Sequence, residues 1–371
     1  MYIKSLKLQN FRNYADESFA FDPAVNLICG ENGQGKTNLL EAAAACSTMR
    51  LFRTAQKKEG LRFGENHAFI FADFLAQERD ISLELRFSRT KAMEIYKNGV
   101  RQKRQSDAQG LLKTVLFCPE DLMLVRAGAA ARRRFLDTAL CQMRPNYARY
   151  LEEYNRLHEH KTRILRDSEE KPSLLSMWED FSLRMAHIGA QIIRYRAYYC
   201  RKLLKAAAAV YADIAPHEVL SGVYKTVSSV TDPFADARTI EKQLIDHVFS
   251  HKTAEIAAKS CLSGPHKDDL ELLLDGRSAA SFGSQGQVRT CTLSLKLAER
   301  ELFFDEDGEY PVLLLDDVMS ELDEQRRRAL VKFVSGDIQT FITTANLAYF
   351  DEDLLAAARV VRLPLEQKDG E

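Results

Sequence analysis

The fold class of this 371-residue chain is decided by the stretch Val25-Asn26-Leu27-Ile28-Cys29-Gly30-Glu31-Asn32-Gly33-Gln34-Gly35-Lys36-Thr37. Its last eight residues match the phosphate-binding pattern G-x-x-x-x-G-K-[ST], an apolar strand leads into them, and a helical pattern follows. Glycines let successive backbone N–H groups turn toward phosphate oxygens, and the helix adds the positive end of its dipole. Lys36 can reach the β- and γ-phosphates, and Thr37 can ligate Mg²⁺. We therefore expect a site for ATP and Mg²⁺ that all eight residues line: Gly30, Glu31, Asn32, Gly33, Gln34, Gly35, Lys36 and Thr37.

A second apolar run ends in two carboxylates. Pro311–Leu315 is followed by Asp316 and Asp317, which is the form of a buried strand that carries a Mg²⁺ ligand at its carboxyl end. Such a run is a weak signal alone, but together with a phosphate-binding loop it indicates a nucleoside-triphosphatase site. We expect Asp316 to bind Mg²⁺ through water. Asp317, with Lys36 the candidate catalytic residue, is expected to orient or deprotonate the attacking water.

Strands and helices alternate near both ends of the chain, which is typical of an α/β domain. Strand-like runs are expected at 2–8, 24–29, 67–74, 81–87, 93–96, 113–117, 218–225, 269–274, 311–315 and 340–343. From about residue 132 to residue 216 the pattern is almost wholly helical. We therefore expect a discontinuous head formed by residues 1–118 and 255–371, with a mainly helical lobe at residues 119–254 inserted in it.

Two apolar stripes in the helical segment predict a pair of helices. The stronger one repeats in steps of four and three from Leu174 to Tyr199 and ends at Leu203, and a weaker one runs from Tyr147 to Leu165. A charged segment that ends in Pro172 separates them. This pattern fits a short, antiparallel, coiled-coil-like arm, and it fits two ordinary core helices of a bundle about equally well.

Composition argues against several classes of protein. The formal net charge is −1, so no global basic field indicates nucleic acid. The seven cysteines form no C-x-x-C pair, so nothing suggests a zinc or dithiol site, and free thiols in a reducing compartment are expected. The sequence has neither a signal-peptide pattern nor an apolar run long enough for a membrane helix. We expect a soluble, cytoplasmic protein without a membrane partner.

Basic residues gather locally in this nearly neutral chain. Residues 121–210 contain 17 lysines and arginines against 10 acidic residues, and the expected hairpin near Asn98 and Gly99 adds further cations. Clustered cations suit contact with DNA phosphates, which positions a protein without reading sequence. Basic residues on helices more often form a solvated face, so each single cluster remains open to that reading.

A serine and a glycine precede the helix expected from about residue 286. Ser284-Gln285-Gly286-Gln287 would place the Ser284 hydroxyl and the Gly286 N–H at the start of this helix, which forms an anion site or simply an N-cap. The segment resembles the signature motif of ABC-type ATPases in a diverged form, and Ser320-Glu321-Leu322-Asp323 resembles their D-loop. In that group the signature motif contacts the γ-phosphate bound to the other protomer. The resemblance therefore implies that Ser284, Gly286 and Gln287 contact ATP in a head-to-tail dimer.

The chain resembles the RecF family, the recombinational-repair ATPases of the ABC/SMC/Rad50-like group, because further motifs occur in the same order along the sequence. Apart from the motifs above, the resemblance is carried by Leu8–Tyr14, Asn38–Ala42, Phe117–Leu122, Arg132–Asp137 and Gly264–Leu270. It implies an ABC-type head with an inserted helical domain, in which Arg12 contacts ATP. It also implies an ATP-induced homodimer that binds gapped or duplex DNA and single-strand/double-strand junctions, with weak, DNA-stimulated hydrolysis. RecR and RecO are the implied partners, and they help to place RecA on single-stranded gaps during repair and replication restart.

Three features depart from the pattern of this group. The turn before the arginine cluster, Ala127–Ala131, lacks proline, and Thr343-Thr344-Ala345-Asn346 stands where ABC transporters place a histidine. Asp317 stands where many ABC ATPases use glutamate, and a shorter carboxylate suits a slow switch better than a motor. A transport ATPase subunit and another SMC- or Rad50-like structural ATPase are the competing interpretations. The missing histidine argues against the first, and the short arm without a paired-cysteine zinc motif argues against the second.

Overall fold

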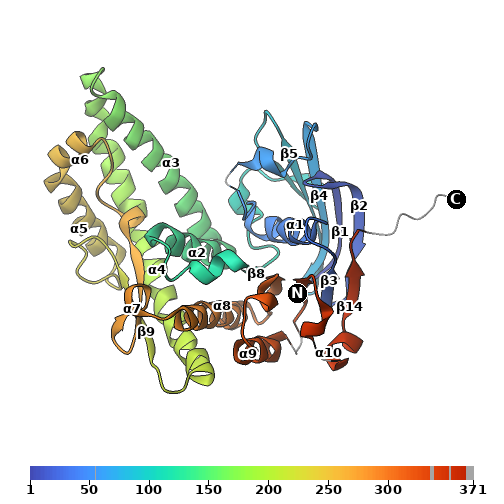
Figure 1. The fold of residues 1–371 in the computed structure, drawn as a ribbon. Coiled ribbons are helices and arrows are strands. Elements are labelled where there is room, and N and C mark those ends of the chain that lie inside the picture. Colours follow the sequence, from blue (N-terminus) through green and yellow to red (C-terminus); the bar gives the residue numbers. More distant parts are fainter. Residues whose placement is uncertain (55, 335–337, 351, 365–371) are drawn as a thin grey trace. The chain divides into compact units, whose positions relative to one another are not determined.

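The computed structural model describes residues 1–371 except 55, 335–337, 351 and 365–371. The chain forms two compact units, one made of Met1–Met123 and Thr292–Glu371 and the other of Leu124–Cys291 (Figure 1). The second unit reaches well beyond residue 254, the boundary expected from the sequence. The reason is strand pairing, since β9 (Leu220–Lys225) pairs along its whole length with β10 (Asp269–Leu274).

A five-stranded parallel sheet forms the centre of the first unit. Its order is β14-β3-β13-β12-β8, and every neighbouring pair is parallel. The strands are β3 (Val25–Cys29), β8 (Thr114–Phe117), β12 (Val312–Asp316), β13 (Thr340–Thr344) and β14 (Arg359–Arg362). Because they are parallel, their carboxyl ends meet at one edge of the sheet, where ligands of α/β proteins bind. Four of the strands were expected from the sequence, and β14 was not.

An antiparallel sheet with the order β2-β1-β4-β5-β6-β7 forms a second layer of this unit. Its strands are β1 (Tyr2–Phe11), β2 (Tyr14–Ala20), β4 (His67–Ala76), β5 (Arg79–Ser88), β6 (Glu94–Lys97) and β7 (Val100–Arg101). Asn98 and Gly99 both have positive φ, 48° and 76°, as the tight turn between β6 and β7 requires. The hairpin predicted from Asn98-Gly99 is therefore present.

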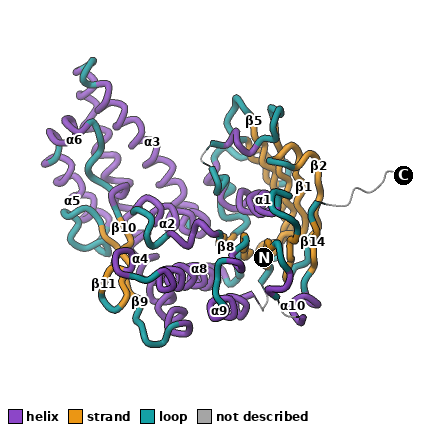
Figure 2. The backbone as a smooth tube through the Cα atoms, in the orientation of Figure 1, coloured by secondary structure: helices purple, strands orange, loops and turns teal. Residues whose placement is uncertain are grey.

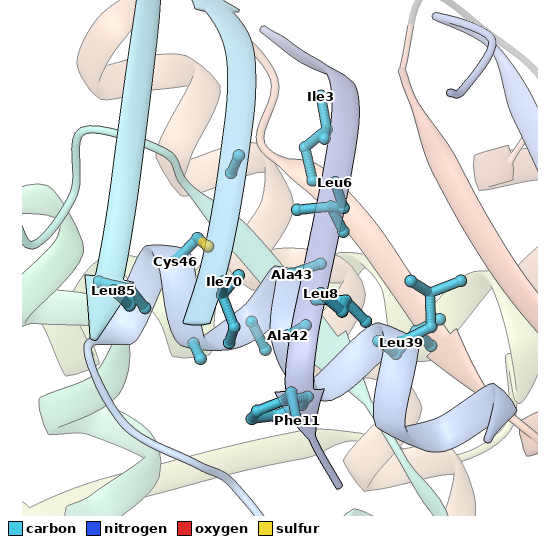
Figure 3. Packing of buried hydrophobic residues seen from close by; sticks show 14 of the residues in the cluster. Ile3, Leu6, Leu8, Phe11, Leu39, Ala42, Ala43, Cys46, Ile70 and Leu85 are labelled. Atoms are coloured by element: carbon cyan, nitrogen blue, oxygen red, sulfur yellow. The ribbon is translucent and has the colours of Figure 1, made fainter. Parts of the chain in front are cut away.

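Helix α1 (Lys36–Thr48) contacts strands of both sheets, including β12 and β13 of one and β4 and β5 of the other. Its alanines and Cys46 are buried, and Figure 3 shows this helix beneath the apolar side chains of β1, β4 and β5. Small side chains let both sheets approach the helix closely, so α1 is held rigidly behind the loop that precedes it. Helices α9 (Glu324–Val334) and α10 (Glu352–Ala357) complete this unit with the second part of α8 (Gln285–Asp307).

The second unit is mainly helical (Figure 2). It contains α2 (Ala129–Met143), α3 (Pro145–Asp167), α4 (Trp178–Ile214), α5 (Ala237–Ser250), α6 (Lys252–Ala258), α7 (Ala279–Phe282) and the start of α8. A small antiparallel sheet, β11-β10-β9 with β11 at Arg277–Ser278, lies in the same unit. Among the residues that the structure describes, no helix has both the length and the apolar character needed to cross a membrane.

Helices α3 and α4 form the expected antiparallel pair. Tyr147 near the start of α3 meets Tyr195 near the middle of α4, whereas Lys161 in the last third of α3 lies over the ring of Trp178 at the start of α4. The predicted stripes supply the contact, since Tyr147, Trp178 and most other members are buried. Helix α4 also packs against α5 and β9, so its apolar surface belongs to the core of the unit.

Candidate nucleotide-binding site

The loop between β3 and α1 has the backbone that a phosphate cradle needs. Gly33 and Gly35 adopt positive φ, 87° and 101°, which non-glycine residues resist. A Cβ at Gly35 would lie 2.6 Å from the Asn13 side chain and 2.9 Å from the Tyr14 hydroxyl. Tyr14 donates a hydrogen bond to the Gly35 carbonyl (3.0 Å), and Asn13 donates one to the carbonyl of Gln34 (3.3 Å). The turn between β1 and β2 therefore holds the loop, a role that the sequence did not reveal.

The side chains of the loop close on its own backbone. Lys36 Nζ donates to the carbonyl oxygens of Gly30 (2.6 Å) and Glu31 (3.0 Å). Gln34 Oε1 accepts a hydrogen bond from the Glu31 N–H (2.9 Å). Neutral carbonyls are weaker acceptors than phosphate oxygens, because charge-assisted hydrogen bonds are roughly twice as strong. A triphosphate would therefore draw the Lys36 ammonium to itself at little cost.

Thr37 and Asp316 meet at the carboxyl edge of the parallel sheet. Thr37 Oγ1 donates to Asp316 Oδ1 (2.9 Å), although the residues are 279 positions apart. Asp316 is 5% exposed, and this burial is the main cause that raises the pKa of its carboxyl group. Hydrogen bonds from the hydroxyls of Thr343 and Thr37 lower the pKa and so partly oppose the effect of burial. A hydroxyl and a carboxylate are the hard oxygen ligands that Mg²⁺ prefers. The two predicted Mg²⁺ ligands thus lie side by side and fit the ion.

Thr343 connects Asp316, the last residue of β12, with Asp317, the residue that follows it. Its Oγ1 donates to Asp316 Oδ1 (2.8 Å) and accepts the backbone N–H of Asp317 (2.8 Å). Strand β13 lies between β3 and β12, and its register sets Thr343 opposite both Ile28 and Asp316. From the sequence, Thr343 is the end of an expected strand and stands where ABC transporters place a histidine, and neither feature predicts this role. Its role depends on strand order, which no local pattern encodes.

Asp317 is the first residue beyond β12, and its backbone is left-handed, with φ 48°. Its side chain is half-buried, and its carbonyl accepts a hydrogen bond from Ser320 (2.8 Å). Aspartate tolerates this backbone region better than most residues do. Its proposed role toward the attacking water remains a prediction.

Arg12 makes a bidentate ion pair with Glu41 of α1. Its Nε and Nη2 lie 2.7 and 3.0 Å from the two carboxylate oxygens, and its Nη1 donates to the Glu59 carbonyl (2.8 Å). Glu41 is fully buried and also accepts the backbone N–H of Arg53 (3.2 Å). Arg12 therefore ties β1 to the helix behind the phosphate loop. The ATP contact expected for Arg12 remains a prediction.

Ser284, Gly286 and Gln287 belong to the second unit. The Ser284 hydroxyl accepts the backbone N–H of Gln287 (3.2 Å), and Gln287 Oε1 accepts the N–H of Ser284 (2.7 Å). This reciprocal pair is a capping box, and α8 begins at Gln285, directly after Ser284. Ser284 and Gln285 are exposed. The O–H of Ser284 can therefore donate to an incoming anion while its oxygen caps the helix.

A buried charge network joins two of the segments that carry the family resemblance. Arg196 of α4 contacts both Asp137 of α2 (2.8 Å) and Asp268 of the segment Gly264–Leu270 (3.3 Å). Burial is the main cause that raises the pKa of Asp268 to about 6, against the effect of Arg196. Arg132 forms a bidentate pair with Asp269, at 2.7 and 2.8 Å. Part of the basic excess in residues 121–210 therefore neutralises internal acids.

Other cations of the second unit face solvent. On α3, Arg149, Arg156 and Arg163 recur every seven residues and are all exposed. A spacing of seven residues is close to two helical turns, so the three lie along one face. Arg163 pairs with Glu159 at 2.8 Å on the same helix. These exposed arginines can contact a row of phosphates, whereas the buried arginines cannot reach one.

A family model and individual relatives give the same result when the sequence is compared with known proteins. The sequence model described as "RecF/RecN/SMC N terminal domain" matches residues 2–364. The chain is 36% identical to the DNA replication and repair protein RecF of Lactobacillus johnsonii over 365 residues, 98% of this chain and 97% of the relative. RecF of Bacillus cytotoxicus is likewise 36% identical over 364 residues, with the same coverage.

Two classes of solved structure are similar. The recombination mediator protein RecF with ATP, from the RecFOR pathway, matches with a TM-score of 0.88 and 32% identity, covering 94% of this chain and 93% of that chain. The Smc head domain of Pyrococcus furiosus matches with a TM-score of 0.53 and 15% identity, covering 96% and 91%, which shows a shared fold. The expected fold, an ABC-type ATPase head with a helical insertion, is confirmed. The chain therefore belongs to the RecF family of DNA replication and repair proteins.

Proposed function

We propose that this chain is an ATP-dependent DNA-binding protein of recombinational repair and replication restart. MgATP joins two copies into a dimer that binds gapped or duplex DNA, and slow hydrolysis separates them. The observation that carries this proposal is the meeting of Thr37 and Asp316 beside a glycine cradle.

The residues of the first unit suggest how ATP is held. Backbone N–H groups of the cradle would surround the β-phosphate, and Lys36 would leave its carbonyl acceptors for the β- and γ-phosphates. Mg²⁺, when bound, neutralises charge on the phosphate oxygens. Thr37 and Asp316 would hold the ion, and Thr343 keeps the Asp316 carboxylate in place. Asp317 follows directly and would orient the attacking water.

The capping box at Ser284 supports a shared site. An exposed serine at the start of a 23-residue helix offers an O–H donor together with the positive end of the helix dipole. In the proposed dimer, Ser284, Gly286 and Gln287 of one copy contact the γ-phosphate held by the loop of the other. Hydrolysis removes that contact, so nucleotide state would control the lifetime of the dimer.

Similarity to a RecF of the RecFOR pathway supports the partners that we propose. These are RecO and RecR, which with this protein would help to load RecA on single-stranded gaps. Exposed arginines along α3 could contact DNA phosphates without selecting sequence.

Light scattering of the full chain with and without MgATP and a short gapped duplex tests this function. We expect ATP to double the mass of the wild type and to promote DNA binding. Lys36→Met should abolish ATP binding and both effects. Ser284→Arg should bind ATP as a monomer yet fail to dimerise. A wild-type protein that stays monomeric with saturating ATP at every concentration, or normal dimers of Ser284→Arg, would contradict the shared-site model.

A further inference from the structure

Ser284, the serine of the signature-like segment, is connected to a chain of hydrogen bonds that no sequence motif predicts. Gln287, whose Oε1 caps the Ser284 N–H, donates from Nε2 to Glu218 Oε1 (2.8 Å). The other oxygen of Glu218 accepts the hydroxyl of Tyr211, a fully buried residue near the end of α4. All four residues lie in the second unit. We propose that Glu218 is the positioning residue that fixes the signature serine for the phosphate of a second copy.

The chemistry of the three groups dictates which way the Gln287 amide points. An ionised carboxylate only accepts hydrogen bonds, so Glu218 must face the NH₂ group of Gln287. The amide oxygen is thereby turned toward Ser284, where it accepts the backbone N–H. Without Glu218 the amide could rotate by half a turn and present a donor to that N–H, which would open the capping box. Glu218 therefore selects the one amide orientation that supports Ser284.

The residue before the serine is held from the other side. Arg126 Nη2 donates to the carbonyl oxygen of Gly283 at 2.8 Å. Arg126 thus holds the carbonyl of the peptide bond between Gly283 and Ser284, and Glu218, through Gln287, holds its N–H. The exposed Ser284 side chain can then approach a phosphate with little loss of conformational entropy on binding.

Glu218 has features of a residue that serves this purpose. It lies in the turn between α4 and β9, is half-buried, and makes its hydrogen bonds to Tyr211 and Gln287 rather than to a cation. Its negative charge would not suit direct contact with a phosphate. It acts through Gln287, and so its loss should change how a second copy grips ATP, while the cradle of its own copy remains intact.

The test measures ATP-induced dimerisation of full-length Glu218→Gln by sedimentation, together with ATP affinity of the monomer. The variant keeps the shape of the side chain but can donate as well as accept. Losing one fixed hydrogen bond to a charged group should weaken each shared site about tenfold. A symmetric dimer contains the site twice, so its dissociation constant should rise by about ten- to a hundredfold. Monomer ATP affinity and the thermal midpoint should stay unchanged.

Three companions make the result specific. Tyr211→Phe removes the other hydrogen bond of Glu218 and should weaken the dimer in the same direction but less. Glu271→Gln on β10, which breaks the surface pair of Glu271 with Lys225 of β9 (2.6 Å), should leave dimerisation unchanged. In a Ser284→Ala background, Glu218→Gln should have a much smaller effect than in the wild type, because the contact that Glu218 positions has lost its hydroxyl.

Because this inference rests on the proposed ATP dimer, the two must be able to fail separately. If Ser284→Arg abolishes the dimer but Glu218→Gln dimerises normally, only the role of Glu218 is wrong. If Glu218→Gln lowers the thermal midpoint and ATP affinity together with dimerisation, the residue merely supports folding. If Ser284→Arg itself has no effect, the shared site is wrong.

Discussion

At the scale of single residues, the site depends on hydroxyl groups that hold carboxylates in place. Thr343 is the clearest example, since its Oγ1 contacts both Asp316 Oδ1 and the backbone N–H of Asp317. Burial already disfavours the charged form of Asp316 and raises its pKa. Each hydrogen bond to the carboxylate opposes that effect. The charge of Asp316, the proposed Mg²⁺ ligand, therefore depends on a residue from a neighbouring strand.

Thr343→Val tests this dependence with little change in side-chain volume. Losing a hydrogen bond to a buried carboxylate should destabilise the ionised form of that carboxylate by about 1.5–3 kcal/mol. We expect the Mg²⁺ concentration needed for hydrolysis to rise at least about tenfold, with ATP affinity in the absence of Mg²⁺ unchanged. Thr340→Val on the same strand is the matched control, since Thr340 is buried and, among the residues described, its hydroxyl bonds to the Ile338 carbonyl (3.4 Å) and to no carboxylate. Equal Mg²⁺ dependence in the two variants would contradict the role of Thr343.

The sequence predicted residues whose chemistry is encoded locally. The cradle, Thr37 and Asp316 could be named as candidates because spacing along the chain determines where they lie. Arg12 was expected to contact ATP, yet the described guanidinium bonds go to Glu41 and the Glu59 carbonyl. Glu41 and Thr343 were missed because their partners are distant in sequence. Such pairs follow from strand order and helix packing, which no single stretch of sequence contains.

At the scale of elements, the strength of the hydrophobic pattern decided which strands could be predicted. Strand β4 alternates between exposed and buried residues along most of its length, and β10 is expected with its observed bounds. Strand β2 buries only Tyr14 and Phe19, and edge strand β14 has no fully buried residue. A strand that is held mainly by its backbone hydrogen bonds leaves little periodic signal.

Helix α8 carries a buried glutamate, Glu299, whose titration should change the free energy of unfolding. Glu299 lies 4.0 Å from Lys296, and its Oε2 has no hydrogen-bond partner among the described residues. Burial raises the pKa of Glu299 from 4.5 to about 7, opposed by Lys296 and assisted by Asp121. Between these two values the folded protein binds a proton that the unfolded chain has lost. The free energy of unfolding therefore falls as pH rises through this window and levels off above it.

Glu299→Gln should remove this contribution. The slope that disappears is at most about 1.4 kcal/mol per pH unit, so the variant should gain stability relative to wild type as pH rises from 5 to 7.5 (about the window between the two pKa values). Thermal unfolding midpoints measured across this range check the prediction. Glu301→Gln, which changes a half-buried glutamate of the same helix, is the control and should keep the wild-type profile. Parallel profiles for wild type and Glu299→Gln would contradict the raised pKa.

At the scale of the whole molecule, the site of the first unit is assembled from both ends of the chain. The parallel sheet takes strands from residues 25–29 and 114–117 and then from three segments after residue 311. The second unit interrupts them, with its own core and its own buried charge network around Arg196. This division explains why the order of motifs along the chain identified the family more securely than any single motif did.

The net charge of −1 constrains how the molecule can bind DNA. Attraction must come from local cations such as the exposed face of α3, and the two copies of the proposed dimer would bring that face to the DNA twice. Each neutralised phosphate contributes about −0.9 to the slope of log affinity against log salt, so about four contacts reduce affinity at least a hundredfold between about 50 and 200 mM salt. We expect this slope for duplex DNA with wild-type protein and ATP, measured by fluorescence anisotropy. Lys36→Met should bind weakly and with a shallower slope, because a monomer neutralises fewer phosphates. Affinity that ignores salt would exclude phosphate contacts, and equal slopes would mean that the dimer does not double them.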